Sequence, residues 1–289
     1  MTDPFDIASP SLPTSELQRL EARFAARSVA VPSGVVSVRE CGSGSAVVCL
    51  HGIGSGAASW LDTALLLELQ ARLIAWDAPG YGESTPLAPE APTAADYAQR
   101  LHELLDALAI DDCVLVGHSL GALTAVAAAR AGSALAPRIR RLLLISPAAG
   151  YGAPGRAEAR ERVHGERLAT LDALGIAGMA QKRSGRLLSD HASELARQWV
   201  RWNMSRLHER GYRQAVELLC NGDLLADLPP AMPVRVACGA LDVVTTPAAC
   251  EEVARRCGVS LELLEAAGHA SYVEQPARVA ALLREVLAR

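Results

Sequence analysis

The chain has 289 residues, about half of them apolar, which is enough for one sizeable core or for a core domain with a smaller insert. Its formal net charge of −4 argues against a general nucleic-acid or anionic-membrane binder, because such proteins present a basic face. No apolar run reaches the ~18 residues that a membrane-spanning helix needs, so no membrane partner is expected.

The N-terminal region predicts a short helix. Residues 1–13 have neither a basic start nor an apolar stretch, so we expect no signal peptide and a cytoplasmic location. The segment 14–27 then has the spacing of an amphipathic helix, with Thr14 or Ser15 as the candidate capping residue.

Strand and helix patterns alternate along the next part of the chain. Strand-like runs are expected at 28–32, 35–40, 46–50, 72–76, 113–116 and 140–145. Helical patterns are expected at 60–70, 93–109 and 120–132. Near-continuous apolar strands that alternate with helices are typical of a parallel sheet covered by helices on both faces.

This alternation stops after residue 149. Residues 150–225 contain no strand pattern; they are helical in composition and rich in arginine, and we name them the lid segment. Strands resume at 234–238 and 260–264, with helices at 247–257 and 275–288. The sequence therefore predicts an α/β core of eight strands, formed by residues 1–149 and 226–289. The lid segment is expected over the carboxyl edge of the sheet, where ligand sites lie in such folds.

The sharpest functional signal is the sequence Gly117-His118-Ser119-Leu120-Gly121. It matches the G-x-S-x-G nucleophile elbow, with the strand before it and the helix after it that this turn requires. The turn forces strained backbone angles on the serine, and a Cβ at either glycine would clash with the adjoining strand and helix. We therefore predict that Ser119 is a nucleophile; a plain strand-to-helix turn that contains serine is the alternative.

A serine hydroxyl needs a base to remove its proton, and in this architecture the acid and then the histidine follow the serine along the chain. Asp242 and His269 each follow one of the two C-terminal strands, so both emerge at the edge that carries Ser119. We predict that His269 exchanges the proton with Ser119 and that Asp242 orients the imidazole. Asp223 and Asp227 are alternative candidates for the acidic residue of the triad, but they precede the strand 234–238, whereas Asp242 follows it. A capping or surface histidine is the alternative for His269.

Hydrolysis through a serine also needs donors for the oxyanion that forms at the carbonyl. One predicted donor is the backbone N–H of Leu120, and the other is that of Ile53 in the glycine-rich loop 51–56. A dinucleotide loop is the alternative for these glycines, but only Asp77 approaches the required acidic spacing. The histidines have no metal-ligand spacing, and the seven cysteines include no close CxxC pair. We expect no cofactor, no metal and no disulfide framework.

Five motifs in chain order resemble the α/β-hydrolase superfamily. They are His51-Gly52, Asp77-Ala-Pro-Gly-Tyr-Gly-Glu-Ser84, Gly117 to Gly121, Gly239-Ala-Leu-Asp242 with Thr246-Pro247, and Gly268-His269 with Glu274-Gln-Pro276. The resemblance implies the α/β-hydrolase fold, with a mostly parallel eight-stranded sheet flanked by helices. The serine at position 119 distinguishes the chain from branches of the superfamily that use a carboxylate nucleophile.

Two groups within the superfamily are similar to this chain. Gly178-Met-Ala-Gln-Lys182 and Asp223-Leu-Leu-Ala-Asp-Leu228 resemble the 3-oxoadipate enol-lactonase-like hydrolases. The loop from His51 to Trp60 is closer to the meta-cleavage C–C bond hydrolases and general esterases.

The lid segment is more basic than the rest of the chain. It carries 12 Lys and Arg against 9 Asp and Glu, a net of +3, so the remaining residues carry −7. We predict that it favours an anionic substrate, clamped by Lys182, Arg183, Arg186 and Arg201; solvated helix faces or ion pairs with the core are the alternative. Trp199 and Trp202 share one helix face, which suits either an apolar acyl pocket or the packing of the lid itself.

Two enzymatic functions fit these residues. The first is hydrolysis of a carboxylic ester or lactone, with a carboxylate-bearing enol-lactone of aromatic catabolism as the substrate that the resemblance implies. The second is C–C bond hydrolysis of a meta-ring-cleavage product by the same triad. A non-catalytic binding protein of this fold ranks last, because the chain keeps all three triad residues. The expected partner is a small molecule, and the sequence is compatible with a homodimer.

Overall fold

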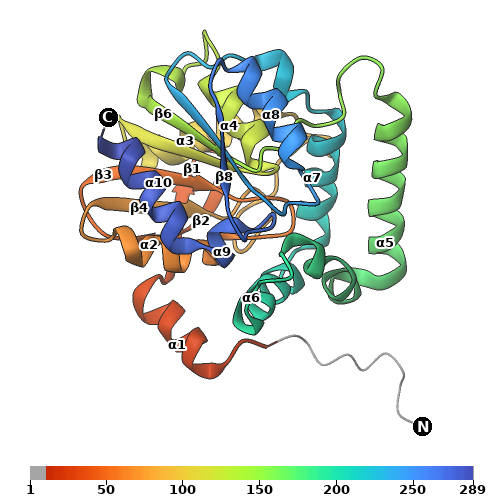
Figure 1. Cartoon of the computed structure of the whole chain (residues 1–289), viewed down its shortest axis with the longest axis horizontal. Coiled ribbons are helices and arrows are strands. Elements are labelled where there is room, and N and C mark those ends of the chain that lie inside the picture. The colour runs from red at the N-terminus through yellow and green to blue at the C-terminus, as the bar shows by residue number, and fades with distance from the viewer. Residues whose placement is uncertain (1–10, 289) are drawn as a thin grey trace.

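The computed structural model describes residues 11–288 (Figure 1). Residues 1–10, on which the signal-peptide prediction mainly rests, lie outside the described residues. The strands are β1 (Ala26–Val31), β2 (Gly34–Cys41), β3 (Ser45–Leu50), β4 (Ala71–Trp76), β5 (Cys113–His118), β6 (Ile139–Ile145), β7 (Val234–Gly239) and β8 (Leu261–Leu264). They form one sheet in the order β1-β2-β4-β3-β5-β6-β7-β8. Strand β2 is antiparallel to both of its neighbours, and every pair from β4 to β8 is parallel.

Helices cover both faces of this sheet (Figure 1). Those outside the lid segment are α1 (Thr14–Arg23), α2 (Leu61–Leu67), α3 (Ala94–Ala107), α4 (Gly121–Ala129), α8 (Pro247–Arg256), α9 (Ser271–Glu274) and α10 (Pro276–Ala288), with short 3₁₀ turns η1 (Ala57–Trp60) and η2 (Ala136–Arg138). Side chains alternate between the two faces along a strand. Accordingly Val48 and Leu50 of β3 lie in one core cluster with α3 and α4, whereas Val47 and Cys49 lie in a second cluster with α2 and α10. The predicted doubly covered sheet is confirmed.

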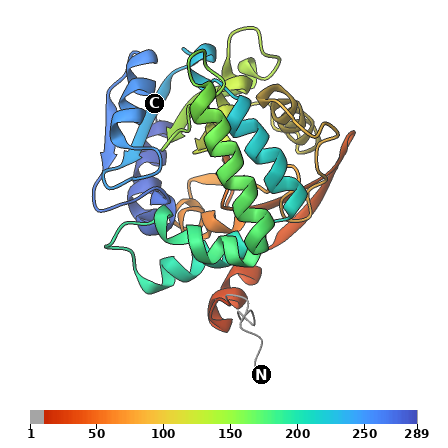
Figure 2. The same ribbon diagram turned by 90° about the vertical axis from the view of Figure 1, so that its right-hand side faces the viewer.

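The lid segment forms helices between β6 and β7. They are α5 (Ala157–Arg183), η3 (Ser184–Leu187), α6 (Glu194–Ser205), α7 (Glu209–Asn221) and η4 (Leu224–Asp227). Figure 2 shows α5 and α7 side by side in front of the sheet, with α6 below them. Helix α5 is interrupted at Gly175, whose φ of 60° and ψ of −174° are not helical. The absence of strands that the sequence predicts for this segment is confirmed over all of its residues, which the structure describes.

The structure corrects one local expectation and adds two features that the sequence analysis did not predict. Helix α1 follows Pro13, which makes no side-chain cap, so the predicted capping role of Thr14 or Ser15 is wrong: both already lie in the first turn. A capping box does occur, at Thr93 and Asp96 of α3. The short helix α9 was not expected. Within residues 11–288 no helix is long and apolar enough to cross a bilayer.

Candidate active site

Ser119 lies at the turn between β5 and α4, with a backbone φ of 51°. This left-handed conformation is strained for any residue other than glycine. A Cβ at Gly117 would lie 2.8 Å from the Cα of Ala122, and one at Gly121 would lie 2.4 Å from the carbonyl oxygen of Leu50. The steric reason for glycine at both positions is therefore confirmed, and it explains how the sequence builds this turn.

Asp242 and His269 meet beside this turn. Asp242 follows β7 and His269 follows β8, and His269 Nδ1 lies 2.8 Å from Asp242 Oδ2. The other carboxylate oxygen accepts the backbone N–H groups of Val244 at 2.7 Å and Thr245 at 3.0 Å. Burial alone would raise the pKa of Asp242, but the hydrogen bond and charge of His269, together with the Val244 N–H, hold that pKa below its ordinary value. The carboxylate is thus ionised and fixed against the imidazole.

Thr245 is a member of this cluster that sequence reasoning missed. Its hydroxyl lies 2.9 Å from the carbonyl oxygen of Ser146, 3.0 Å from Asp242 Oδ2 and 3.1 Å from His269 Nδ1. A hydroxyl has one proton to donate, so it donates to one of the two oxygens, while the Nδ1 proton of His269 goes to the nearer Asp242. No motif signals this role, because it depends on the carbonyl group of Ser146, the residue that follows β6.

Ser119 and His269 line the same cavity, whose volume is about 330 Å³. Among the described residues, no hydrogen bond joins the Ser119 hydroxyl to the imidazole. Such bonds are often long before substrate binds and shorten in the reacting complex. Because Nδ1 donates to Asp242, Nε2 is the nitrogen left to accept a proton.

The predicted oxyanion donors, Ile53 and Leu120, line the cavity as well. The carbonyl of Gly52 accepts from His51 Nδ1 at 2.8 Å and from the N–H of Ser55 at 3.1 Å. In a trans peptide the N–H points opposite to the carbonyl, so these two bonds fix the direction of the Ile53 N–H. A Cβ at Gly52 would lie 2.9 Å from the Cβ of Ser119, which shows how closely this loop approaches the serine. His51 therefore orients the loop; burial lowers its pKa and favours the neutral ring.

His118 lies beneath the same site. Its Nε2 donates to the carbonyl oxygen of His269 at 2.9 Å, and its Nδ1 has no partner among the described residues. Burial is the main cause that holds the pKa of His118 well below its ordinary value, so the ring is neutral. The contact joins the turn of β5 to the loop after β8.

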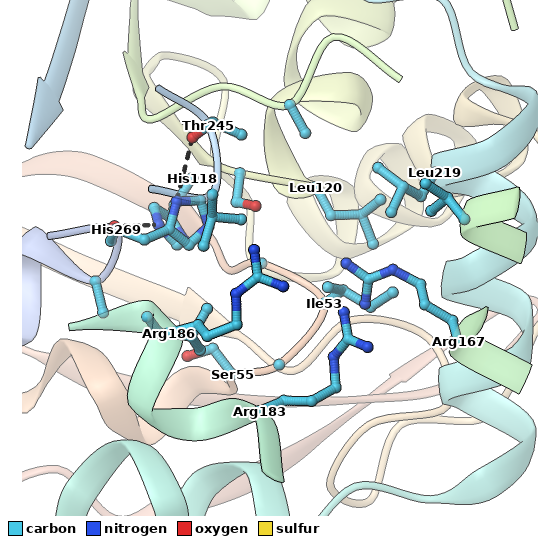
Figure 3. A pocket seen from close by; sticks show the side chains of 18 of the residues that line it. Ile53, Ser55, His118, Leu120, Arg167, Arg183, Arg186, Leu219, Thr245 and His269 are labelled. Carbon is cyan, nitrogen blue, oxygen red and sulfur yellow. Dashed lines mark hydrogen bonds between the residues drawn. The ribbon is translucent and has the colours of Figure 1, made fainter. Parts of the chain in front are cut away.

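Arginines of the lid segment occupy the side of the cavity away from the sheet. Figure 3 shows the guanidinium groups of Arg167, Arg183 and Arg186 pointing into the cavity, and we name these three the arginine triplet. Burial and the positive charge of Arg167 lower the pKa of Arg183, and Arg186 adds to the effect. Among the described residues none of the three has an ion-pair partner, although Arg167 donates to the Tyr212 hydroxyl at 3.1 Å. Glu166 lines the same cavity and partly opposes the lowering of the Arg183 pKa, but positive charge prevails there, which suits an anion.

The structure corrects the predicted set of lid contacts. Arg183 and Arg186 line the cavity, but Lys182 and Arg201 do not. Lys182 is exposed because neighbouring helical residues project in different directions. Trp199 and Trp202 are buried in the second core cluster and pack edge to face with ring centroids 5.5 Å apart, so they correspond to the packing alternative.

Further charged residues at the start of α5 and just before it line the cavity without having been predicted. Arg156 lies over the ring of Tyr151, and Arg162 pairs with Glu166 at 3.7 Å. Within residues 11–288 no group of three or more His, Cys, Asp or Glu side chains is arranged to hold a metal ion.

Known proteins of similar sequence and structure support the same architecture. The chain is 34% identical over 122 residues to a 2-hydroxy-6-oxononadienedioate/2-hydroxy-6-oxononatrienedioate hydrolase of Dechloromonas aromatica, which is 40% of each protein. It is 32% identical over 96 residues to the 2-hydroxy-6-oxo-6-phenylhexa-2,4-dienoate hydrolase of Comamonas testosteroni, covering 32% of this chain and 34% of that one. The matches thus span less than half the length of these curated relatives.

Solved structures match over most of the chain. The enol-lactonase of Burkholderia xenovorans has a TM-score of 0.78 at 23% identity, covering 91% of this chain and all of that one. A thermophilic esterase of Thermogutta terrifontis has a TM-score of 0.76 at 24% identity, covering 91% and 98%. At these identities the likeness shows the fold. The sequence profile of the alpha/beta hydrolase family matches residues 47–282, which is most of the chain. The protein therefore belongs to the alpha/beta hydrolase family and has its fold, as the five motifs predicted.

Proposed function

We propose that this hydrolase cleaves a carboxylic ester or lactone through an acyl-enzyme formed on Ser119. The observation that carries the proposal is that the His269 imidazole, paired with Asp242 at 2.8 Å, lines the same cavity as Ser119. The esterase and the enol-lactonase among the similar structures support this class of reaction.

The proposed reaction follows from the positions of these groups. His269 Nε2 removes the proton of the Ser119 hydroxyl as its oxygen attacks the substrate carbonyl, and Asp242 stabilises the imidazolium that forms. The N–H groups of Ile53 and Leu120 stabilise the resulting oxyanion. The imidazolium then gives its proton to the leaving alcohol, which stays attached to the acyl group when the substrate is a lactone. Water, activated by the same imidazole, releases the acid.

The arginine triplet favours an acyl group that carries a carboxylate. Three cations that share one cavity repel one another, and an anionic substrate relieves that repulsion while it accepts their hydrogen bonds. The serine would then react with a carbonyl at the opposite side of the cavity. This proposal keeps Arg183 and Arg186 of the predicted clamp and adds Arg167.

The nucleophile assignment is tested with a fluorophosphonate probe and intact-protein mass spectrometry. The wild type should gain one probe adduct, and Ser119→Ala should gain none and lose about 10⁴-fold or more in kcat on p-nitrophenyl acetate. Ser55→Ala is the matched control, because Ser55 lines the same cavity and should leave labelling intact. Labelling of folded Ser119→Ala, checked by circular dichroism, would refute the assignment. A folded wild type with neither labelling nor turnover would favour a non-catalytic binding protein.

C–C bond hydrolysis is the second candidate function. It is favoured by the sequence relatives, two of which are named as hydrolases of ring-cleavage-type dienoates. The same residues would act after the substrate ketonises. Rates on p-nitrophenyl acetate, an enol-lactone and a vinylogous 1,5-diketone dienoate separate the two functions. A preference for the dienoate by orders of magnitude would replace the first proposal with the second.

A further inference from the structure

A single carboxylate joins the lid segment to the loop that carries His269. Glu274, the last residue of α9, accepts the N–H of Gly268 on its Oε1 at 2.7 Å. Its Oε2 accepts the N–H of Ser189 at 3.0 Å and the hydroxyl of the same residue at 2.6 Å. The carboxylate therefore binds three donors from two segments. Gly268 directly precedes His269, and Ser189 follows the turn η3, which contains Arg186.

The two segments also touch through their backbones. The N–H of Ala270 donates to the carbonyl oxygen of Leu187 at 2.7 Å. A Cβ at Gly268 would lie 2.6 Å from the nitrogen of Ser189, so only glycine allows this approach. Leu188 and Ala270 belong to one small apolar cluster. The lid is thus in direct contact with the loop that holds the imidazole.

Helix α9 is itself held by the core, which makes Glu274 a fixed point. Tyr272 of α9 stacks on Trp60 with ring centroids 4.2 Å apart, and its hydroxyl lies 2.9 Å from the Ser55 hydroxyl. Both tyrosine and tryptophan are fully buried. A movement of the lid at Ser189 must therefore break bonds to a carboxylate that cannot follow it.

We propose that Glu274 is a positioning residue that sets the distance between the arginine triplet and the imidazole of His269, and thereby the selectivity for anionic acyl groups. The proposal rests on the function proposed above. Glutamine cannot replace this carboxylate, because it has one acceptor oxygen and its NH₂ group would face an N–H donor. Substitution should loosen the lid against the His269 loop while leaving the triad residues themselves unchanged.

The kinetic test compares Glu274→Gln with Glu265→Gln. Glu265 is an exposed acid in the same loop, so it is a matched control for the change in charge. The substrates are the mono-p-nitrophenyl ester of glutaric acid, which is anionic, and p-nitrophenyl butyrate, which is neutral. In Glu274→Gln the ratio of kcat/KM for the anionic ester over the neutral ester should fall about tenfold. The ratio should not change in the control, and an unchanged ratio in Glu274→Gln overturns the proposal.

Hydrogen exchange tests the bridge without any substrate. The amides of Ser189 and Gly268 should exchange about tenfold faster in Glu274→Gln, because both lose an acceptor, and the control should match the wild type. If Glu274→Gln does not fold, Ser189→Ala removes the hydroxyl donor alone and should give smaller changes of the same sign. If neither amide exchanges faster, or only one of them does, Glu274 does not link the lid segment to the His269 loop and the proposal is overturned. If the wild type shows no preference for the anionic ester, the proposed role of the arginine triplet is refuted. Hydrogen exchange then still tests whether Glu274 links the lid segment to the His269 loop.

Discussion

Replacing Arg183 by methionine tests the proposed anion site most directly. The change removes one guanidinium of the arginine triplet and keeps a long unbranched side chain at the cavity wall. A hydrogen bond to a charged group contributes about 1.5–3 kcal/mol, and 1.4 kcal/mol corresponds to about tenfold in a rate or binding constant. We therefore expect kcat/KM on a carboxylate-bearing ester to fall by about 10–100-fold. A neutral ester of the same length should react at nearly the wild-type rate.

Stability provides an independent part of the same test. Burial, and after it the neighbouring cations, lower the pKa of Arg183, which means that its charge is disfavoured where it stands. The melting temperature of Arg183→Met should accordingly equal or exceed that of the wild type. Lys182→Met is the matched control, because this neighbour is exposed and does not line the cavity. It should change neither selectivity nor melting temperature.

Two results would refute this reasoning. If Arg183→Met lowers the rates on the anionic and the neutral ester equally, the arginine supports the general architecture of the cavity and not an anion. If Lys182→Met loses as much selectivity as Arg183→Met, the effect comes from the net charge of the lid. In the second case the loss should also be abolished by salt, because exposed charges are screened over about 10 Å at 0.1 M ionic strength.

Two further predictions concern the triad and the lid. Asp242→Asn should lower kcat about 10³–10⁴-fold, because the imidazole loses its orienting acceptor. Since the folded-state pKa of Asp242 lies below its ordinary 3.8, the ionised carboxylate stabilises the fold at neutral pH and this contribution is lost as the pH falls below about 4. Urea titrations should therefore show that the difference in free energy of unfolding between wild type and Asp242→Asn becomes smaller at acid pH. A difference that does not change with pH would contradict this prediction. Gly175→Ala places a side chain at a φ of 60°, so it should cost about 1 kcal/mol or straighten α5. In either case the melting temperature and the preference for the anionic ester should both change in this variant.

The triad residues were predictable because the sequence pattern indicates where the parallel strands end. Ser119 and Asp242 each follow a largely apolar strand whose end is buried, and His269 follows the more exposed strand β8; in a parallel sheet these ends share one edge. The glycines at 117 and 121 were predictable for a steric reason that involves only the turn and its neighbours. These inferences need no knowledge of contacts between distant side chains.

Residues whose role depends on a contact with a distant segment could not be predicted from a local sequence pattern. Thr245 reaches the carbonyl of Ser146, and Glu274 reaches Ser189 in the lid. Glu274 stands in a recognised motif, but its partner in the lid could be found only from the folded chain. The same holds for the direction of the Ile53 N–H, which depends on the bonds to the preceding carbonyl.

The lid arginines show most clearly why a helical pattern alone does not place a site. In a straight α-helix, Arg167 and Arg183 would be separated by about 24 Å along the axis and by about 160° around it, on nearly opposite faces. Both nevertheless line the cavity with Arg186, and the break at Gly175 is what separates α5 into two parts with independent directions. Glycine at 175 meets no neighbouring atom within 4 Å, so it is not required by close packing. Its left-handed φ is the feature that glycine supplies here. The charge of the lid segment led us to predict an anion site, which stays a prediction, and the sequence already named Arg183 and Arg186. Only the bend in the helix explains why Arg167 lines the same cavity.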